Sequence, residues 1–144
     1  MLLFLDFDGV MHPVGCSVDR YFCHLDLVQD WLRRHPAIKV VISSSWRTAH
    51  PLDEIQSYFA EDLGHRVIGT TPIGITKAGE LPSYEREAGI EEFLARNSLT
   101  NTAWVAIDDQ PHLFSPACDR LVVCDGAIGL TYAHLEQVDC LLAQ

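Results

Sequence analysis

The sequence predicts an α/β fold in which a doubly wound, mainly parallel sheet carries helices on both faces. Short apolar runs such as Leu2-Leu3-Phe4-Leu5 are typical of strands buried on both faces. Segments with helical periodicity separate these runs along the chain. Polar or acidic residues follow several of the runs, at the edge where open parallel sheets bind ligands. The 144 residues are expected to form one domain.

Each element follows from its local pattern. Apolar and β-branched runs predict strands at 2–5, 38–42, 66–69, 102–107 and 120–124. Apolar residues at helical spacing predict helices at 24–35, 52–63, 84–97 and 132–142. Pro36 ends the first helix and Gly64 is a plausible stop for the second. The segment after Gly9 is expected to be a loop or small hairpin, and 70–82 an irregular loop over the site. Internal repeats, low-complexity segments and linkers are absent from the sequence.

The first strand runs directly into two acidic residues, Asp6 and Asp8. If the extended geometry persists, their side chains leave on the same side, and Gly9 then allows a sharp turn. Two carboxylates this close are costly to ionise together unless a cation lies between them, and Mg²⁺ prefers such oxygen ligands. An EF-hand calcium loop also begins D-x-D. It is excluded because a strand precedes this motif and no Glu closes the loop.

Two later segments are expected at the same edge of the sheet. The strand at 38–42 ends in Ser43-Ser44-Ser45, and the strand at 102–107 is followed by Asp108 and Asp109. Right-handed crossovers between parallel strands place all their carboxyl ends together. Acidic oxygens, a hydroxyl group and nearby arginines describe a site for a phosphate group.

Charge and cysteine content narrow the class of protein. A net charge of -10 lacks the basic footprint of a protein that binds long nucleic acid, so phosphate recognition must be local. Five cysteines without a C-x-x-C pair fit neither a disulfide framework nor a zinc ribbon, and the spacing of His12, Cys16, Cys23 and His24 matches no common zinc site. No apolar run is long enough to cross a membrane, and the N-terminal run is too short for a signal peptide. We therefore expect a cytoplasmic protein; its oligomeric state does not follow from the sequence.

The combined motifs resemble those of the haloacid dehalogenase-like (HAD) superfamily of phosphohydrolases. That family has a strand ending D-x-D-G-[TV], a second strand ending in Ser or Thr, a basic residue, and a strand ending in an acidic pair. The matching segments here are Asp6-Phe7-Asp8-Gly9-Val10, Ile42-Ser43-Ser44-Ser45-Trp46-Arg47 and Ile107-Asp108-Asp109. The S-S-S-W-R segment and the R-x-x-x-I-x-x-F-L helix look more narrowly like the HAD domains of bacterial RNA-repair (Swiss Army Knife) proteins, akin to the phosphatase half of polynucleotide kinase.

The resemblance implies roles for the first motif and the serines. Asp6 would be the nucleophile that becomes an aspartyl phosphate. Asp8 would donate a proton to the leaving oxygen and then accept one from water, while its backbone carbonyl binds the metal. Ser44 would hydrogen-bond a phosphoryl oxygen, with Ser43 or Ser45 as alternatives because the end of the strand is uncertain.

The resemblance to the HAD superfamily also implies a metal site and a basic residue. Asp6, Asp8, Asp108 and Asp109 would hold Mg²⁺, one of the last two directly and the other through water. Arg86 fits the basic position best, and Lys77 is the alternative, although either could be a surface charge. 

Three further side chains near these motifs are candidates for the site. Arg47 could contact substrate or pair with an acidic neighbour. Trp46 is expected in core packing rather than as a base-stacking platform. His12 either lines the site or is a solvated loop histidine.

The substrate is inferred from the size of the connections. Family members with a large cap act on small metabolites, whereas those without one admit bulky ends. The gaps 9–25 and 47–86 are too short for a sizeable cap, so a Rossmannoid core with little or no cap is expected. The prediction is a Mg²⁺-dependent phosphatase acting on a phosphorylated RNA or DNA end. One alternative is a small-metabolite or nucleotide phosphatase, which the acidic charge favours; the other is a non-catalytic binding module, which the intact D-x-D motif disfavours.

Overall fold

The protein is built on a five-stranded sheet whose described strands all run parallel. The structure is a computed structural model and describes residues 1–73 and 78–144. The strand order is β3-β2-β1-β4-β5. The strands are β1 (Leu2–Leu5), β2 (Lys39–Ile42), β3 (Val67–Thr70), β4 (Trp104–Asp108) and β5 (Leu121–Val123). The predicted α/β fold with a parallel sheet is confirmed.

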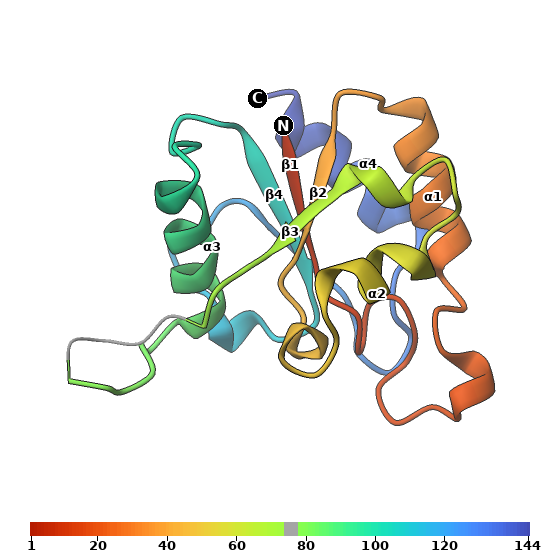
Figure 1. Cartoon of the computed structure of the whole chain (residues 1–144), viewed down its shortest axis with the longest axis horizontal. Helices are drawn as coiled ribbons and strands as arrows, with labels where there is room; N and C mark the ends of the chain where they lie inside the picture. Colours follow the sequence, from red (N-terminus) through yellow and green to blue (C-terminus); the bar gives the residue numbers. More distant parts are fainter. Residues whose placement is uncertain (74–77) are drawn as a thin grey trace.

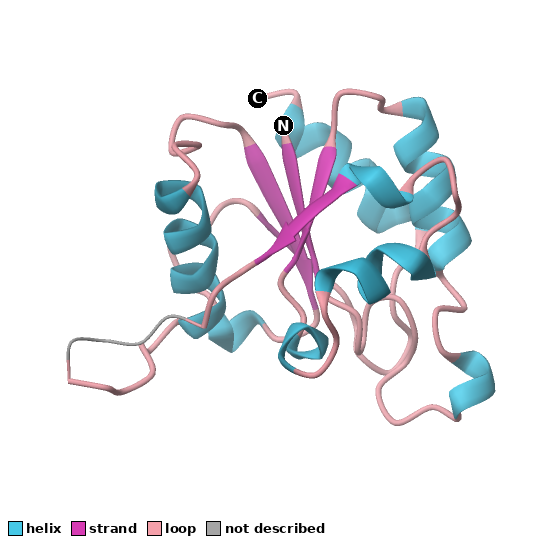
Figure 2. Ribbon diagram, viewed as in Figure 1, coloured by secondary structure: helices cyan, strands magenta, loops and turns pink. Residues whose placement is uncertain are grey.

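Helices cover both faces of this sheet, as Figure 2 shows. They are α1 (Leu25–Arg34), α2 (Leu52–Tyr58), α3 (Glu85–Arg96) and α4 (Tyr132–Leu142). Leu3 and Leu5 of β1 pack in one apolar core with α1, α2 and α4. Leu2 and Phe4 pack in a second core with α3 on the opposite face. The alternation of side chains along a buried strand therefore produces the doubly wound arrangement.

The strand register aligns polar residues where the strands end. Leu5 pairs with Ile42 of β2 and with Ile107 of β4, so that Asp6, Ser43 and Asp108 follow at the same level. Ile42 pairs in turn with Thr70 of β3, which adds Thr71. We call Thr71, Ser43, Asp6 and Asp108 the carboxyl-end row. Because side chains alternate, the row continues the positions of Leu2, Phe4 and Val41, on the face covered by α3.

The second helix is shorter than its apolar spacing predicts. We expected a helix over 52–63, but α2 ends at Tyr58 and Phe59 has an extended backbone with ψ 155°. The backbone N–H of Ala60 donates to Oε1 of Gln29 in α1, at 2.6 Å. Phe59 and Leu63 are nevertheless buried in the core. The prediction of a helix after Tyr58 is therefore wrong, although the apolar residues of this segment are buried. The N–H of Ala60 bonds to α1 instead of to a carbonyl of its own helix.

The connections at the carboxyl ends of the strands contain little regular structure. Between β1 and α1 the structure has a short 3-10 turn, Val18–Arg20, and no helix of α type. The described part of the β3–α3 connection extends sideways from the sheet in Figure 1 rather than across the strand ends. None of the helices formed by 1–73 and 78–144 is long and apolar enough to cross a membrane.

Candidate active site

Three carboxylates meet where β1 and β4 end. Asp6, Asp108 and Asp109 each place one oxygen within 4.8 Å of the others, and we call them the acidic cluster. Asp6 and Asp108 are buried and Asp109 is partly buried. The cluster forms because β1 and β4 are neighbours in register, so residues that follow the two strands lie side by side. The parallel arrangement expected from the sequence therefore brings these three side chains together.

Arg86, in the first turn of α3, lies between two members of the cluster. Its Nη1 is 3.2 Å from Oδ1 of Asp6 and 3.0 Å from Oδ2 of Asp108. Within the described residues neither Nη1 nor Oδ2 of Asp108 has a partner in hydrogen-bond geometry, so these are close charge contacts rather than directed bonds. The guanidinium is buried with the carboxylates. Arg86 thus supplies positive charge directly beside Asp6 and Asp108.

Burial and mutual repulsion make the cluster hard to ionise. Burial, and then the nearby Asp6 carboxylate, raise the pKa of Asp108 to about 7, while Arg86 opposes the shift. The same two causes raise the pKa of Asp109 to about 6. A bound cation would favour the charged forms and reverse both shifts.

Three oxygens of the cluster lack a hydrogen bond within the described part of the chain, and their chemistry indicates what the cluster could hold. Oδ2 of Asp6, Oδ2 of Asp108 and Oδ1 of Asp109 are buried without a hydrogen-bond partner among the described residues. Buried polar atoms are normally paired because leaving them unpaired is costly. All three atoms are carboxylate oxygens, which are the ligand type of hard divalent cations such as Mg²⁺. The residues present therefore fit such a cation.

Two glycines enclose the Asp109 carboxylate. A Cβ added at Gly9 would lie 2.2 Å from Oδ2 of Asp109, and one added at Gly126 would lie 2.5 Å from the same oxygen. Gly9 also has φ +78°, a conformation that other residues rarely adopt. The glycine of the D-x-D-G motif is thus required for both the turn and the position of Asp109.

Asp8 has a different environment from Asp6. Its Oδ1 lies 2.8 Å from Nε2 of His12, and its Oδ2 accepts a hydrogen bond from Nε1 of Trp46 at 3.0 Å. The turn after β1 returns His12 to this position, because the N–H of Gly9 donates to the carbonyl of His12. Asp8, His12 and Trp46 are called the Asp8 clamp below.

The two donors of the clamp agree with the sequence expectations only in part. The His12 side chain is only 1% exposed, so its interpretation as a solvated loop histidine is wrong. Trp46 packs against Phe7 and Phe22, as core packing predicts, but it also has the polar contact with Asp8. A histidine four residues after Asp8 was the available sequence signal for the first contact; the second joins segments far apart in the chain.

The three serines after β2 have different environments. Oγ of Ser44 accepts the N–H of Trp46 at 3.3 Å, where the 3-10 turn Ser45–Thr48 begins. Ser45 is exposed. Ser43 is buried beside Asp6 in the carboxyl-end row, and its Oγ has no hydrogen-bond partner among the described residues. Of the three serines, Ser43 therefore lies next to Asp6 and has a hydroxyl that no described residue occupies, so it is free to bind a ligand.

Arg47 is bound to backbone rather than to an acidic side chain. Its Nε donates to the carbonyl of Thr71 at 2.7 Å, and its Nη1 donates to the carbonyls of Ser43 and Ser44 at 3.0 and 2.9 Å. Arg47 thereby joins the ends of β2 and β3 beside the cluster. Lys77, the alternative basic residue, lies outside the described residues.

Thr71 is a buried member of the carboxyl-end row that the sequence analysis did not single out. Its side chain is buried, and its Oγ1 is another hydroxyl without a partner among the described residues. A Cβ added at Gly89 of α3 would lie 3.6 Å from Cβ of Thr71, which places this side chain on the same face as Arg86. A threonine in a loop rich in Gly, Pro and Thr carries no distinguishing signal in the sequence.

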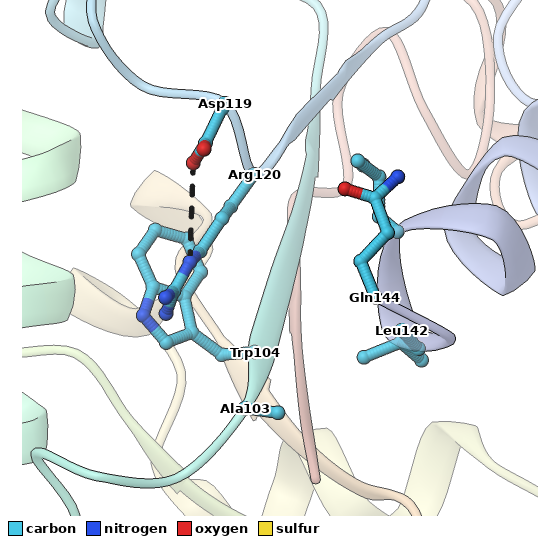
Figure 3. A pocket seen from close by; sticks show the side chains of 7 residues that line it. Ala103, Trp104, Asp119, Arg120, Leu142 and Gln144 are labelled. Carbon is cyan, nitrogen blue, oxygen red and sulfur yellow. Dashed lines mark ion pairs between the residues drawn. The ribbon is translucent and has the colours of Figure 1, made fainter.

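A separate cavity lies at the opposite end of the sheet, where β4 begins. Figure 3 shows its lining of Ala103, Trp104, Asp119, Arg120, Leu141, Leu142 and Gln144. The guanidinium of Arg120 lies 5.3 Å from the centre of the Trp104 ring and pairs with Asp119 at 3.9 Å. The acidic cluster, at the other end of β4, remains the candidate site because it combines buried acids with unpaired oxygens.

Comparison with known families agrees with this geometry. The family model described as the HAD domain in Swiss Army Knife RNA repair proteins matches residues 2–135. No curated protein matches the chain. The matched range includes β1 with Asp6, the serines after β2, Arg86, and β4 with Asp108 and Asp109. Because the match spans most of the sequence, the chain belongs to the family of HAD domains found in Swiss Army Knife RNA repair proteins.

Proposed function

We propose that this protein is a Mg²⁺-dependent phosphatase that hydrolyses a phosphomonoester at an RNA or DNA end through an aspartyl phosphate on Asp6. One observation carries the proposal. A chain of the HAD family of RNA repair proteins holds three carboxylates, two buried and one partly buried, at the ligand-binding edge of its sheet, and each has an oxygen without a hydrogen-bond partner among the described residues. Strongly perturbed acids at such an edge are typical of active sites.

Asp6 and Asp8 would divide the reaction between them. A carboxylate oxygen of Asp6 forms a bond to phosphorus while the ester P–O bond breaks, and Asp8 gives a proton to the departing alcohol oxygen. Water then attacks the aspartyl phosphate, Asp8 accepts the water proton, and phosphate leaves with Asp6 restored. The burial of Asp6 and the 47% exposure of the Asp8 side chain suit these roles, since Asp8 has to reach both the leaving group and water.

The remaining side chains would bind and neutralise the phosphate. The acidic cluster would hold Mg²⁺, which supplies positive charge to the phosphoryl oxygens when bound. We assign to Ser43, rather than Ser44 or Ser45, the hydrogen bond to a phosphoryl oxygen, because its hydroxyl is buried next to Asp6 and uncommitted. Arg86 would fix Asp6 from one side through the charge contact at 3.2 Å.

A nucleic-acid end is proposed as the substrate because of the family and the open edge. The matching family is described by RNA repair. The described parts of the β1–α1 and β3–α3 connections contain no strand or α-helix that would form a cap. An accessible edge of this kind admits a phosphate attached to a polymer.

Turnover of p-nitrophenyl phosphate with Mg²⁺ tests the proposal. Asp6→Asn should reduce kcat by at least about 10³-fold, because it removes the nucleophile. Asp119→Asn changes an aspartate whose side chain is 92% exposed and should leave kcat unchanged. Circular dichroism checks that both variants are folded. Inactive wild-type protein, or full activity in Asp6→Asn, would overturn the proposal.

A second assay tests the substrate class. Oligonucleotides with 3′- or 5′-phosphates should be hydrolysed at least as well as free nucleotides. The opposite ranking would favour a small-metabolite or nucleotide phosphatase.

A further inference from the structure

We infer that His12 and Trp46 are positioning residues that hold the Asp8 carboxylate in the orientation needed to protonate the leaving group. The inference rests on the proposed function, in which Asp8 is the proton donor. It concerns two side chains outside the acidic cluster.

The two donors together fix the plane of the Asp8 carboxylate. His12 contacts Oδ1 at 2.8 Å and Trp46 donates to Oδ2 at 3.0 Å, so rotation of the carboxylate would break both contacts. Each oxygen keeps a second lone pair, on which a proton can reside. Because the side chain is 47% exposed, a lone pair remains accessible to substrate. The clamp therefore restricts orientation without blocking access.

The hydrogen bonds of His12 determine which of its nitrogens donates. Nδ1 accepts the backbone N–H of Phe22 at 3.2 Å, which leaves the ring proton on Nε2, facing Asp8. Phe22 has φ +60°, an unusual backbone conformation for a residue other than glycine. The imidazole is stacked on Tyr21 with ring centres 4.7 Å apart. The β1–α1 connection thus keeps His12 in the tautomer that donates to Asp8.

Trp46 is held equally firmly by its surroundings. Its ring meets Phe7 edge-on at 5.7 Å and Phe22 at 5.3 Å, and it is stacked on His50 at 5.0 Å. Its backbone N–H donates to Oγ of Ser44. The indole N–H consequently donates to Asp8 from a ring that is packed among other aromatic side chains.

The role of the clamp can be separated from general structural support by varying the leaving group. The ratio kcat/KM reports the steps up to departure of the alcohol. An alkyl alcohol needs a proton as it leaves, whereas nitrophenolate leaves without one. Misplacing Asp8 should therefore slow alkyl phosphates selectively, while a disturbed fold would slow all substrates alike.

The experiment compares 4-nitrobenzyl phosphate with p-nitrophenyl phosphate, in the presence of Mg²⁺. Trp46→Phe keeps an aromatic ring but removes the donor, and should lower kcat/KM for the benzyl ester by about 10- to 100-fold. For the nitrophenyl ester the decrease should be below about 3-fold, since proton transfer contributes little there. Trp31→Phe is the matched control, because its Nε1 donates to Oδ1 of Asp139 at 2.8 Å between α1 and α4. It should leave the ratio between the two substrates unchanged.

A second pair of variants makes the test independent of Trp46. His12→Gln can donate to Asp8 and accept from Phe22, and should retain more benzyl-ester activity than His12→Ala. If circular dichroism shows that Trp46→Phe is unfolded, the comparison of the two His12 variants decides the test. An equal loss for both esters, or no loss for either, would overturn the inference while leaving the phosphatase proposal intact. Wild-type protein that hydrolyses neither ester would instead overturn the proposed function.

Discussion

Asp6 and Asp8 follow the same strand two residues apart but have opposite environments. Asp6 is buried beside two other acids, and its Oδ2 has no hydrogen-bond partner among the described residues. Asp8 is half-exposed, and both of its oxygens have partners supplied by the chain. Among the described residues, the chain therefore supplies hydrogen-bond partners to both oxygens of Asp8, but not to every oxygen of the acidic cluster. Substitutions and changes of pH should therefore affect the acidic cluster and its surroundings to different extents.

The largest effect on stability is expected from Arg86→Leu. The substitution leaves the buried acids Asp6 and Asp108 without their positive neighbour, which should lower the free energy of unfolding by about 3–5 kcal/mol at pH 8. Urea denaturation without divalent cation measures the change. Arg33→Leu is the control, because Arg33 pairs with Asp30 and Asp62 at the surface and should contribute far less. Equal losses in the two variants would show that the cluster does not depend on Arg86.

An intermediate effect is expected from pH. The raised pKa values of Asp108 and Asp109, about 7 and about 6, mean that the folded state binds more protons than the unfolded state between about pH 4 and 7. Stability of the metal-free protein should therefore fall as pH rises, by about 3 kcal/mol between pH 5 and pH 8, with most of the change from Asp108 because solvent screening reduces the contribution of the partly buried Asp109. Urea denaturation in EDTA at pH 5 and pH 8 measures the difference.

The same titrations predict how Mg²⁺ acts. The cation should stabilise the protein more at pH 8, where the carboxylates are ionised, than at pH 5. Asp108→Asn should flatten the pH dependence because it removes the group with the larger shift. The metal-free wild-type protein could instead become more stable from pH 5 to pH 8, and Asp108→Asn could do so to the same extent. That result would contradict the claim that ionisation of the acidic cluster destabilises the folded protein.

The smallest effect is expected from Thr71→Val. It replaces an unpaired buried hydroxyl by a methyl group of similar size, so the free energy of unfolding should change by less than about 0.5 kcal/mol. Ser44→Ala removes a hydroxyl that accepts the N–H of Trp46 and should cost about 1 kcal/mol. Thermal unfolding of both variants makes the comparison. A larger loss from Thr71→Val would show that its hydroxyl has a structural partner.

The fold and the acidic cluster could be predicted because their signals are local. Apolar runs identify the strands, and the right-handed crossover rule then places Asp6 near Asp108 without knowledge of any contact. The serine nearest Asp6 could not be identified in this way. Ser43 and Ser44 differ by one position, which reverses the face of the sheet, and the strand register that separates them is a tertiary property.

The sequence could suggest His12 as a residue that lines the site, but it could not predict the complete Asp8 clamp, for a related reason. His12 becomes buried only because residues 13–24 fold back over it, with Phe22 in a left-handed conformation that no periodic pattern reveals. Trp46 reaches Asp8 from a separate segment of the chain. The end of α2 was missed because the partner of Ala60, Gln29, belongs to α1.

The close fit of Gly9 and Gly126 around Asp109 affects how the site would take up an ion. The connection that carries Gly126 is hydrogen-bonded to the turn after β1, through Val14 to Gly126 and through Leu130 to Val10. Asp109 is consequently bounded on two sides by backbones that are tied to each other. An ion held by the acidic cluster would meet this carboxylate in a preset position, and water would supply the ligands that the chain does not, as is usual for Mg²⁺.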